Sequence, residues 1–351
     1  MGDATNAPAA AKSPKGSKIR VAVTQHEPVW LDLEGSVQKT IKIIQEAATA
    51  GAKRVAFSEC WIPGYPAWIW TRPVDFDLGV KYVKSSLALD STEMQTLCAA
   101  AAEHKINVSL GFSERDGNSV YIAQALIDDT GNIAMNRRKM KPTHMERTIF
   151  GDSSGECLAK VVPLPETGRV GGLSCWEHIQ PLLKYWVLQQ NEEVHVAAWP
   201  PLDDFINGSP GFWSMSVEGC RGLSQTYAVE AQAYVLHTTQ VITEFGTKLM
   251  GTEGSPLMGH PIQGSSAVIA PDGRILSEAG TKNEELIIAD LDLEQVVKTK
   301  TFADASGHCK FFVSDRASAN KRTDSRPDML WLGADPTTKP VVRVTAMAPS
   351  S

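Results

Sequence analysis

The sequence lacks the patterns that would tie it to a metal, a nucleotide or a disulfide framework. Its six cysteines are scattered without CxxC spacing, which indicates reduced thiols, and its eight histidines form no HxxxH pair. The segment Gly168-Arg-Val-Gly-Gly172 is neither a dinucleotide-binding nor a P-loop fingerprint. We therefore expect no metal site and no cofactor.

Charge and hydropathy exclude further classes of protein. A net charge of −6 argues against nucleic acid or an anionic membrane as the main partner, and no apolar run reaches membrane-spanning length. The first residues lack the charged-then-apolar order of a signal peptide, so a cytoplasmic location is expected. A hydrophobic content of 42% and a charged content of 21% are typical of a soluble globular protein.

Strands and helices alternate along the chain and then give way to hairpins, which indicates one α/β domain over residues 18–332. Residues 1–17 are predicted to be a disordered tail, and residues 333–351 a C-terminal tail. β-branched alternation predicts strands at 18–25, 54–58, 106–112, 120–128, 133–140, 194–199, 234–242, 265–270 and 285–291. Helical spacing predicts helices at 33–50, from 90–93 to 105, at 179–189 and at 213–232, whereas 61–70 is too rich in proline and glycine for regular structure.

The stretch Val170-Gly-Gly-Leu-Ser-Cys-Trp-Glu-His178 reads as a strand that stops at Cys175 and turns into a helix. Helix N-terminal amides lower the pKa of a thiol and favour the nucleophilic thiolate, so Cys175 is a candidate nucleophile. The alternative is a small buried apolar residue, which most free cysteines are.

Two other polar features also stand at predicted strand ends, where α/β proteins place their sites. Glu59 closes an apolar strand, and the run from Arg137 to Arg147 is basic with one acid, Glu146, inside it. A thiol nucleophile needs a base for its proton and a cation or amide donor for the charge that develops on the substrate. These residues can fill those roles, but two surface ion pairs and a buried thiol would give the same pattern.

Four long motifs in order resemble the signature blocks of the nitrilases, from about Lys18 to Leu332. They are Phe57-Ser-Glu-Cys-Trp-Ile-Pro-Gly-Tyr-Pro66, Arg137-Arg-Lys-Met-Lys-Pro-Thr-His-Met-Glu-Arg147, Cys175-Trp-Glu-His-Ile-Gln-Pro-Leu182 and Val194-His-Val-Ala-Ala-Trp-Pro200. The third block is most like the fungal and bacterial branch that acts on aliphatic and arylacetic nitriles.

The resemblance implies a four-layer αββα sandwich that pairs across its helices into a homodimer and builds larger spiral homo-oligomers. It implies Glu59 as general base, Lys139 as cationic stabiliser, Cys175 as nucleophile and Glu146 as a second, positioning carboxylate. A small-molecule nitrile would become a thioimidate, then a thioester, and leave as carboxylic acid and ammonia. The Trp176 amide would join Lys139 in holding the developing negative charge.

The aromatic residues near these motifs are candidates for the substrate pocket. Trp61, Tyr65, Trp68 and Trp70 could line a pocket for an apolar or aromatic nitrile, or could be core or subunit interface. Trp199 and His178 lie closer to the nucleophile by motif. Cyanide hydratases usually carry Asn where this chain has His178, so the histidine favours the acid over the amide.

Three alternatives keep the same kind of fold. A cyanide-hydratase-like enzyme would stop at the amide, and a filament-forming assembly protein would have lost the chemistry. An amidase or carbamoylase of the wider superfamily is disfavoured by the long block that begins at Trp61.

The C-terminal block departs from the family pattern Gly-His-Tyr-Ser-Arg-Pro-Asp. Gly307-His308 and Ser325-Arg-Pro-Asp328 are both present, but Cys309 to Asp324 stand where one Tyr is expected. A surface loop is one interpretation, and an unspliced intron is our hypothesis. Codons 309 to 311 can carry the donor GTAAGT, codons 323 and 324 can supply an acceptor AG, and removal would restore the Tyr in frame. Genomic codons without GT across positions 309 and 310 would exclude the intron.

Overall fold

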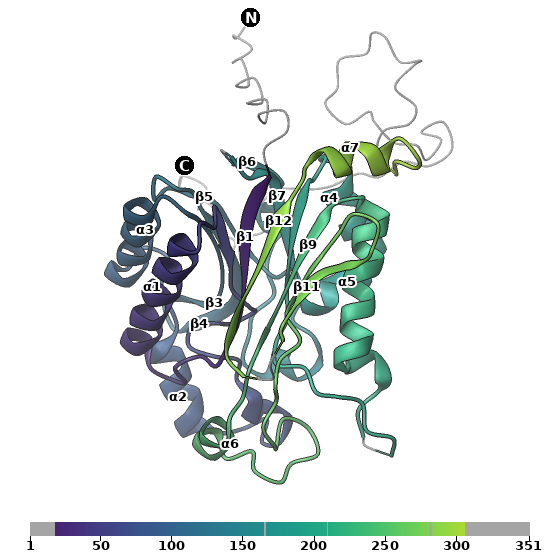
Figure 1. Ribbon diagram of the computed structural model, residues 1–351. Helices are drawn as coiled ribbons and strands as arrows, with labels where there is room; N and C mark the ends of the chain where they lie inside the picture. Colours follow the sequence, from purple (N-terminus) through teal and green to yellow (C-terminus); the bar gives the residue numbers. More distant parts are fainter. Residues whose placement is uncertain (1–17, 165, 209, 281–282, 306–351) are drawn as a thin grey trace, which may run out of the picture.

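The computed structural model describes residues 18–164, 166–208, 210–280 and 283–305. Two sheets pack face to face, and helices cover the outer face of each (Figure 1). The four-layer αββα sandwich is thereby confirmed. The C-terminal segment 309–324 and both predicted tails lie outside the described residues.

The first sheet has the strand order β5-β4-β3-β2-β1-β12. Its central strands are parallel, and antiparallel hairpin strands extend one edge. The bounds are β1 Ile19–His26, β2 Arg54–Ala56, β3 Asn107–Asp116, β4 Ser119–Ile127, β5 Ile133–Arg138 and β12 Glu285–Leu291.

The second sheet has the order β6-β7-β8-β9-β10-β11, with β7, β8 and β9 parallel. The bounds are β6 Val162–Leu164, β7 Gly168–Ser174, β8 Val194–Ala198, β9 Tyr234–Gln240, β10 Ala267–Ile269 and β11 Ile275–Glu278. A short parallel contact of Gln25 with Thr239 and of His26 with Gln240 joins the two sheets. As a result, the strands that precede Glu59, Lys139 and Cys175 all point to the same end of the sandwich.

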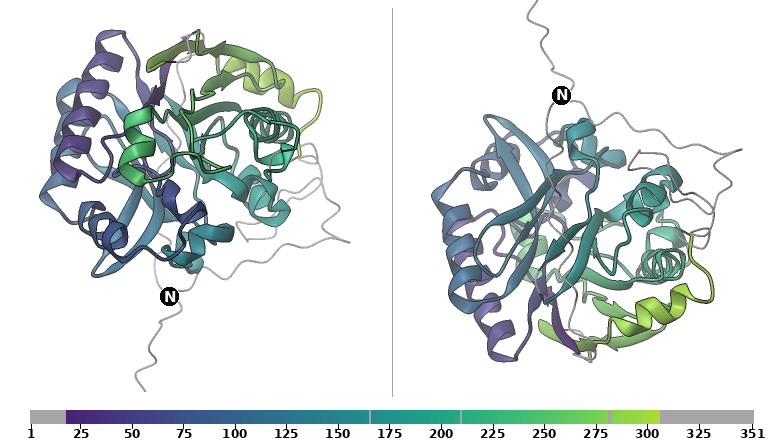
Figure 2. Two further views of the ribbon diagram at one scale, coloured as in Figure 1. Left: turned by 90° about the horizontal axis from the view of Figure 1, so that it is seen from below. Right: turned by 90° about the horizontal axis from the view of Figure 1, so that it is seen from above.

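Helices α1 (Leu33–Thr49) and α3 (Thr92–His104) cover the first sheet, while α4 (Pro181–Leu188) and α5 (Val217–Ala231) cover the second (Figure 2). Three cores correspond to the three interfaces between layers. Ile44, Leu97 and Val108 pack beneath α1 and α3, Val23, Val196 and Leu236 fill the space between the sheets, and Val187, Tyr227 and Val235 pack beneath α4 and α5.

Several predicted elements need correction. Ser91 caps α3, so this helix begins at Thr92. Ser216 caps α5, and the predicted helix 213–232 divides into η5 (Trp213–Met215) and α5. The segment after β7 begins with the 3-10 helix η4 (Cys175–Ile179), and α4 starts only at Pro181. The stretch 61–70 contains a 3-10 helix, η1 (Ala67–Trp70).

Three described helices were not predicted. They are α2 (Phe76–Ser85), α6 (Glu244–Met250) and α7 (Glu294–Lys300). In α2 the apolar Phe76 and Val80 are exposed while Tyr82 is buried, and Gly79 lies inside the helix, so helical spacing does not single out its buried side. The other two span seven residues each, too short to give a clear period. Among the described helices, none combines the length and the apolar character that crossing a bilayer requires.

Gly111 on β3 lets the chain that carries Glu59 cross directly over the strand. A Cβ atom at Gly111 would lie 2.0 Å from the Ser58 carbonyl oxygen and 3.1 Å from the Glu59 Cα. No flexible side chain can yield there, because both neighbours are backbone.

We therefore expect Gly111→Ala to lower the free energy of unfolding by about 1–3 kcal/mol, as overpacking does. Urea denaturation of the purified protein measures the change. Gly79→Ala is the matched control: an added Cβ meets open space within α2, and the change should be neutral or stabilising by up to ~1 kcal/mol. A Gly111→Ala protein as stable as the parent would contradict this account of the close approach.

Candidate active site

A buried ammonium group joins two carboxylates at the shared end of the strands. Lys139, directly after β5, donates from Nζ to Oε1 of Glu59 and to Oε2 of Glu146, each at 2.8 Å. All three side chains are buried. A buried charge is stable only when paired and hydrogen-bonded, so each of these groups depends on the others.

Glu146 is fixed by its own turn as well as by Lys139. It lies in η2 (His144–Thr148), where its Oε2 accepts from the Thr143 amide at 2.6 Å in a capping box. Its other oxygen accepts from the Tyr65 hydroxyl at 3.3 Å, and Tyr65 in turn accepts from the Trp70 indole at 3.1 Å. The structure thus brings the predicted Tyr65 and Glu146 into direct contact.

Cys175 is the first residue of η4 and adopts a left-handed backbone, with φ of 50°. Such a conformation in a non-glycine residue persists only where the surroundings enforce it. The side chain is buried, and its sulfur and the carboxylate oxygens of Glu59 and Glu146 lie within 4.8 Å of one another. The three predicted motifs therefore meet around one thiol.

Glu177 holds the sharp turn at Cys175. Its carboxylate accepts from the Ser174 and Met140 amides, both at 2.9 Å, and forms a two-pronged pair with Arg137 at 2.7 and 2.8 Å. This fully buried pair ties the turn after β7 to the strand that leads to Lys139. The nucleophile and the ammonium group are therefore positioned by one shared set of bonds.

The predicted lowering of the Cys175 pKa is wrong. Burial raises the pKa of the thiol well above its usual value; Lys139 opposes this, but Glu59 and Glu146 add to it. The helix that begins at Cys175 is a 3-10 helix of only five residues, not the longer helix on which the prediction relied. The nearby carboxylates disfavour a thiolate. The resting thiol is protonated and needs a base.

Glu59 has the properties of that base. Burial raises its pKa to about 8, although the Lys139 ammonium lowers it, and Glu146 raises it further. One carboxylate oxygen holds Lys139, while the other, Oε2, has no hydrogen-bond partner within the described part of the chain. The free oxygen is available to accept a proton.

Lys139 is suited to an electrostatic role instead. Burial alone lowers the pKa of its ammonium, but Glu146, Glu59 and Cys175 more than offset burial and hold the pKa well above its usual value. An ammonium that keeps its proton stabilises negative charge and does not act as a base. Glu59, Glu146 and Cys175 are also donor types that bind metals, but the Lys139 ammonium already bonds to both carboxylates.

His178 and Trp199 lie behind the thiol. The His178 ring stacks on the Trp199 indole with centroids 5.0 Å apart, and its Nδ1 lies 2.6 Å from the Cys175 carbonyl oxygen. The Glu59 amide donates to the Trp199 carbonyl at 3.2 Å, and Trp176 is half-buried against the core beneath α4 and α5. These residues frame the thiol from the second sheet.

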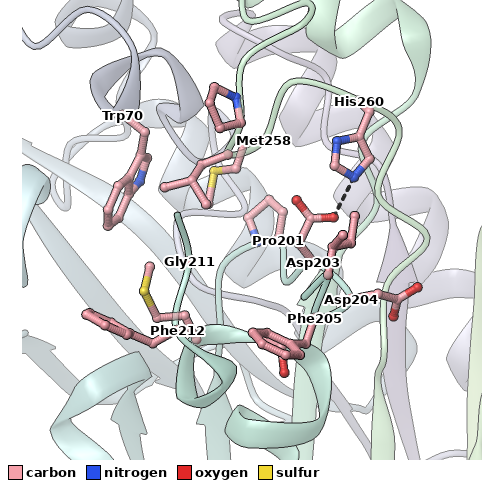
Figure 3. A pocket seen from close by; sticks show the side chains of 14 residues that line it. Trp70, Pro201, Asp203, Asp204, Phe205, Gly211, Phe212, Met258 and His260 are labelled. Carbon is pink, nitrogen blue, oxygen red and sulfur yellow. Dashed lines mark ion pairs between the residues drawn. The ribbon is translucent and has the colours of Figure 1, made fainter. Parts of the chain in front are cut away.

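The aromatic run divides between core and pocket. Trp61 and Trp68 are core residues, whereas Trp70 lines a hollow between the 201–216 and 256–260 segments. Figure 3 shows Trp70 on one side of the hollow, Phe212 and Met258 near it, and the ion pair of His260 with Asp203 at 2.8 Å on another side. Tyr65 and Trp70 connect this hollow to Glu146 through two hydrogen bonds.

Sequence reasoning missed the residues that position the site. Arg137, Glu177 and His195 stand inside the quoted motifs, and Glu192 lies just before one of them. Buried charged residues in a motif need partners, and that was the available signal. Their pairing across two sheets could not be deduced from spacing.

Comparisons with known proteins agree with this geometry. The carbon-nitrogen hydrolase family profile matches residues 20–301. An arylacetonitrilase from Hypocrea virens is 54% identical over 326 residues, covering 93% of this chain and 94% of that protein. An arylacetonitrilase from Aspergillus niger is 55% identical over 320 residues, covering 91% of this chain and 89% of that protein.

Solved structures share the fold. A carbon-nitrogen hydrolase from Helicobacter pylori G27 superposes with a TM-score of 0.65 at 18% identity, covering 82% of this chain and 94% of the other. An amidase from Nesterenkonia sp. AN1, with an acetamide moiety on its active-site cysteine, gives 0.59 at 17% identity, covering 82% and 95%. At these identities the likeness concerns the fold.

We expect the alkylation of Cys175 by iodoacetamide to accelerate as the pH rises through about 8, where Glu59 becomes ionised and can take the thiol proton. Mass spectrometry of the Cys175 peptide measures the rate. In Glu59→Gln the acceleration should move to higher pH, because the thiol must then ionise at its own raised pKa. Cys98, on α3, serves as the internal reference. Identical Cys175 profiles in both proteins would show that Glu59 does not take the proton.

Proposed function

Because the chain belongs to the carbon-nitrogen hydrolase family, and within it to the nitrilases, we propose that it hydrolyses arylacetonitriles to arylacetic acids and ammonia. The buried cluster of Glu59, Lys139 and Glu146 around the Cys175 thiol carries the proposal. The substrate class follows the names of relatives that match most of the chain.

In the first half of the proposed reaction, Glu59 accepts the Cys175 proton as sulfur attacks the nitrile carbon. A C–S bond forms, one C–N π bond breaks, and the electron pair moves to nitrogen. Nitrogen then takes a proton from Glu59 to give the thioimidate. Lys139 and the Trp176 amide stabilise the negative charge as it develops on nitrogen.

In the second half, water adds to the thioimidate while Glu59 accepts its proton. The tetrahedral species expels ammonia as nitrogen receives that proton back from Glu59 and also the proton of the new hydroxyl group, which leaves a thioester. A second water, again deprotonated by Glu59, releases the carboxylic acid and restores the Cys175 thiol. One nitrile and two waters thus give one acid and one ammonia, and a base near neutrality suits this repeated transfer.

The hollow beside Trp70 supports an aromatic substrate. Trp70, Phe212 and Met258 give it an apolar lining, and Phe212 is 75% exposed. Apolar pockets with few polar groups are typical of small-molecule sites. Trp70 also connects the hollow to the cluster, because it donates to Tyr65, which donates to Glu146.

The main alternative product is the amide, which would form if the tetrahedral species expelled sulfur and not ammonia. His178 favours the acid through the resemblance described above. A non-catalytic, filament-forming protein is the second alternative, and the intact cluster around Cys175 argues against it.

We expect Cys175→Ala to abolish ammonia release from phenylacetonitrile, because no other described thiol lies in the cluster. Ammonia and phenylacetamide are assayed together, so the acid-to-amide ratio is obtained at once. Cys98→Ala, which removes a partly buried thiol on α3, should retain full activity. Undiminished ammonia release by Cys175→Ala would refute the assigned nucleophile. An inert wild-type protein across a panel of nitriles would favour the assembly protein.

We further propose that the chain forms a homodimer through its second helix layer and builds a larger spiral homo-oligomer. Leu182 on α4 is 71% exposed, and Ile179 in η4 and Val229 on α5 are also exposed. A run of exposed apolar side chains on one layer is typical of an interface.

We also propose that the protein is located in the cytoplasm. The free thiols among the described cysteines suit a reducing compartment. Cell fractionation would test this.

Leu182→Glu should shift the purified protein to a smaller assembly, because burying an unpaired carboxylate in an interface is unfavourable. Light scattering after size-exclusion chromatography measures the mass. Val80→Glu, at an exposed apolar position on the opposite helix layer, is the control and should leave the mass unchanged. A monomeric wild type would refute the assembly.

A further inference from the structure

A chain of buried polar groups runs from the backbone of Cys175 into the second sheet. His178 Nδ1 lies 2.6 Å from the Cys175 carbonyl oxygen, and its Nε2 lies 3.1 Å from Nε2 of His195. His195 Nδ1 lies 2.8 Å from Oε1 of Glu192, and Tyr227 donates to Oε2 of Glu192 at 2.7 Å. All four side chains are buried, and the reaction steps above use none of them.

The two ends of this chain fix how many protons it holds. A carbonyl oxygen and a carboxylate oxygen are both acceptors. One hydrogen must therefore lie between Nδ1 of His178 and the Cys175 carbonyl oxygen, and another between Nδ1 of His195 and Oε1 of Glu192. The contact between the two Nε2 atoms needs a third. Two neutral imidazoles bring only two hydrogens, so three short contacts require one more proton than the neutral rings and an ionised Glu192 supply.

The extra proton belongs to the His195 end of the chain. Burial, with His195 beside it, holds the pKa of His178 well below its usual value, so His178 stays neutral. Burial also raises the pKa of Tyr227 well above its usual range, so its hydroxyl remains a donor to Glu192. The carboxylate of Glu192 can balance a proton on His195, or take that proton itself.

The other groups that face the chain do not supply this proton. Burial lowers the pKa of His237 on β9 to about 3, so that ring is neutral. Lys184 on α4 pairs with Glu230 on α5 at 2.6 Å, and the charges of this pair offset each other. The Cys175 thiol is protonated, as described above.

We propose that His178, His195 and Glu192 are positioning residues that share one buried proton and with it hold the Cys175–Trp176 peptide. In this arrangement the hydrogen runs from His195 Nε2 to His178 Nε2, and from His178 Nδ1 to the Cys175 carbonyl. The inference rests on the proposed function for its catalytic meaning, since the same peptide carries the Trp176 amide that faces the developing charge. The proton arrangement itself does not depend on the reaction.

Two physical effects follow from a hydrogen bond to the Cys175 carbonyl. It restrains the peptide plane at a residue whose left-handed backbone would otherwise relax. It also polarises the peptide, which makes the Trp176 N–H a stronger donor. The His178 ring can transmit both effects because Trp199 stacks on its face and Tyr227 meets it edge-on.

The direct test is ¹⁵N NMR of the wild-type full chain with labelled histidine, with signals assigned from His178→Gln and His195→Gln. We expect a proton on Nδ1 and none on Nε2 of His178, and a proton on Nε2 of His195. A bare Nδ1 on His178 would overturn the proposal. Because no substrate is needed, this result stands even if the protein proves inert towards nitriles.

The kinetic test compares Glu192→Gln with Glu192→Ala. The Gln amide can donate to His195 Nδ1 and accept from Tyr227, so it satisfies every contact without the extra proton. We expect Glu192→Gln to keep most of the wild-type kcat, and Glu192→Ala to lose about tenfold in kcat with little change in KM, since misplaced catalytic groups lower the rate of the chemical step.

The split between kcat and KM separates positioning from simple packing. A misplaced peptide lowers kcat alone, whereas a general packing defect would also change KM. Glu230→Gln is the matched control, because it removes a nearby carboxylate that takes no part in these hydrogen bonds, and it should keep the wild-type kcat and KM. Equal losses in Glu192→Gln and Glu192→Ala, or an unimpaired Glu192→Ala, would overturn the proposal.

Discussion

The structure depends on one buried ammonium group, that of Lys139, between two buried carboxylates. Removal of one partner from such a group typically costs about 3–5 kcal/mol, because an uncompensated charge remains inside the protein. The bonds to Glu59 and Glu146 therefore fix the ends of β2 and β5 and the turn of η2 relative to each other. The backbone of Glu59 is also held by the second sheet, through the Trp199 carbonyl and the Gln240 side chain. Charge pairing thus aligns the two sheets where the chemistry takes place.

A second buried pair, Arg137 with Glu177, performs the same task for the nucleophile. A left-handed residue such as Cys175 stores on the order of 1–3 kcal/mol of strain, so the turn needs bonds that enforce it. Glu177 supplies them by accepting from the Ser174 and Met140 amides while it pairs with Arg137. Because Arg137 and Lys139 are two residues apart at the end of β5, both side chains lie on the same face of the sheet. One short segment therefore positions both ends of the reacting system.

How much the sequence could predict depended on how local each feature is. The strand before Glu59 and the strand before Cys175 carry a clear apolar pattern, so their ends, and the fold class, were predictable. Helix α2 was not, because the exposed Phe76 and Val80 stand among its more buried residues and Gly79 lies inside it. The pKa of Cys175 was predicted in the wrong direction, since a helix start is visible in the sequence whereas two carboxylates from distant segments are not. Roles came from motifs, but the bonds between motifs are long-range and needed the structure.

The charges of the site explain why a protonated thiol is an advantage. With Glu59 and Glu146 ionised and Lys139 protonated, the cluster carries one net negative charge, so a thiolate beside it would be a second. Transfer of the thiol proton to Glu59 as sulfur attacks keeps the total at one throughout. That single charge moves from Glu59 to sulfur and then to the substrate nitrogen, always near the Lys139 ammonium. Arg137 and Glu177 form a pair with no net charge, and the proposed proton shared by His195 and Glu192 balances the charge of Glu192. These buried groups therefore add no further negative charge near the cluster. The low-dielectric interior therefore stabilises a charge that changes place but not amount.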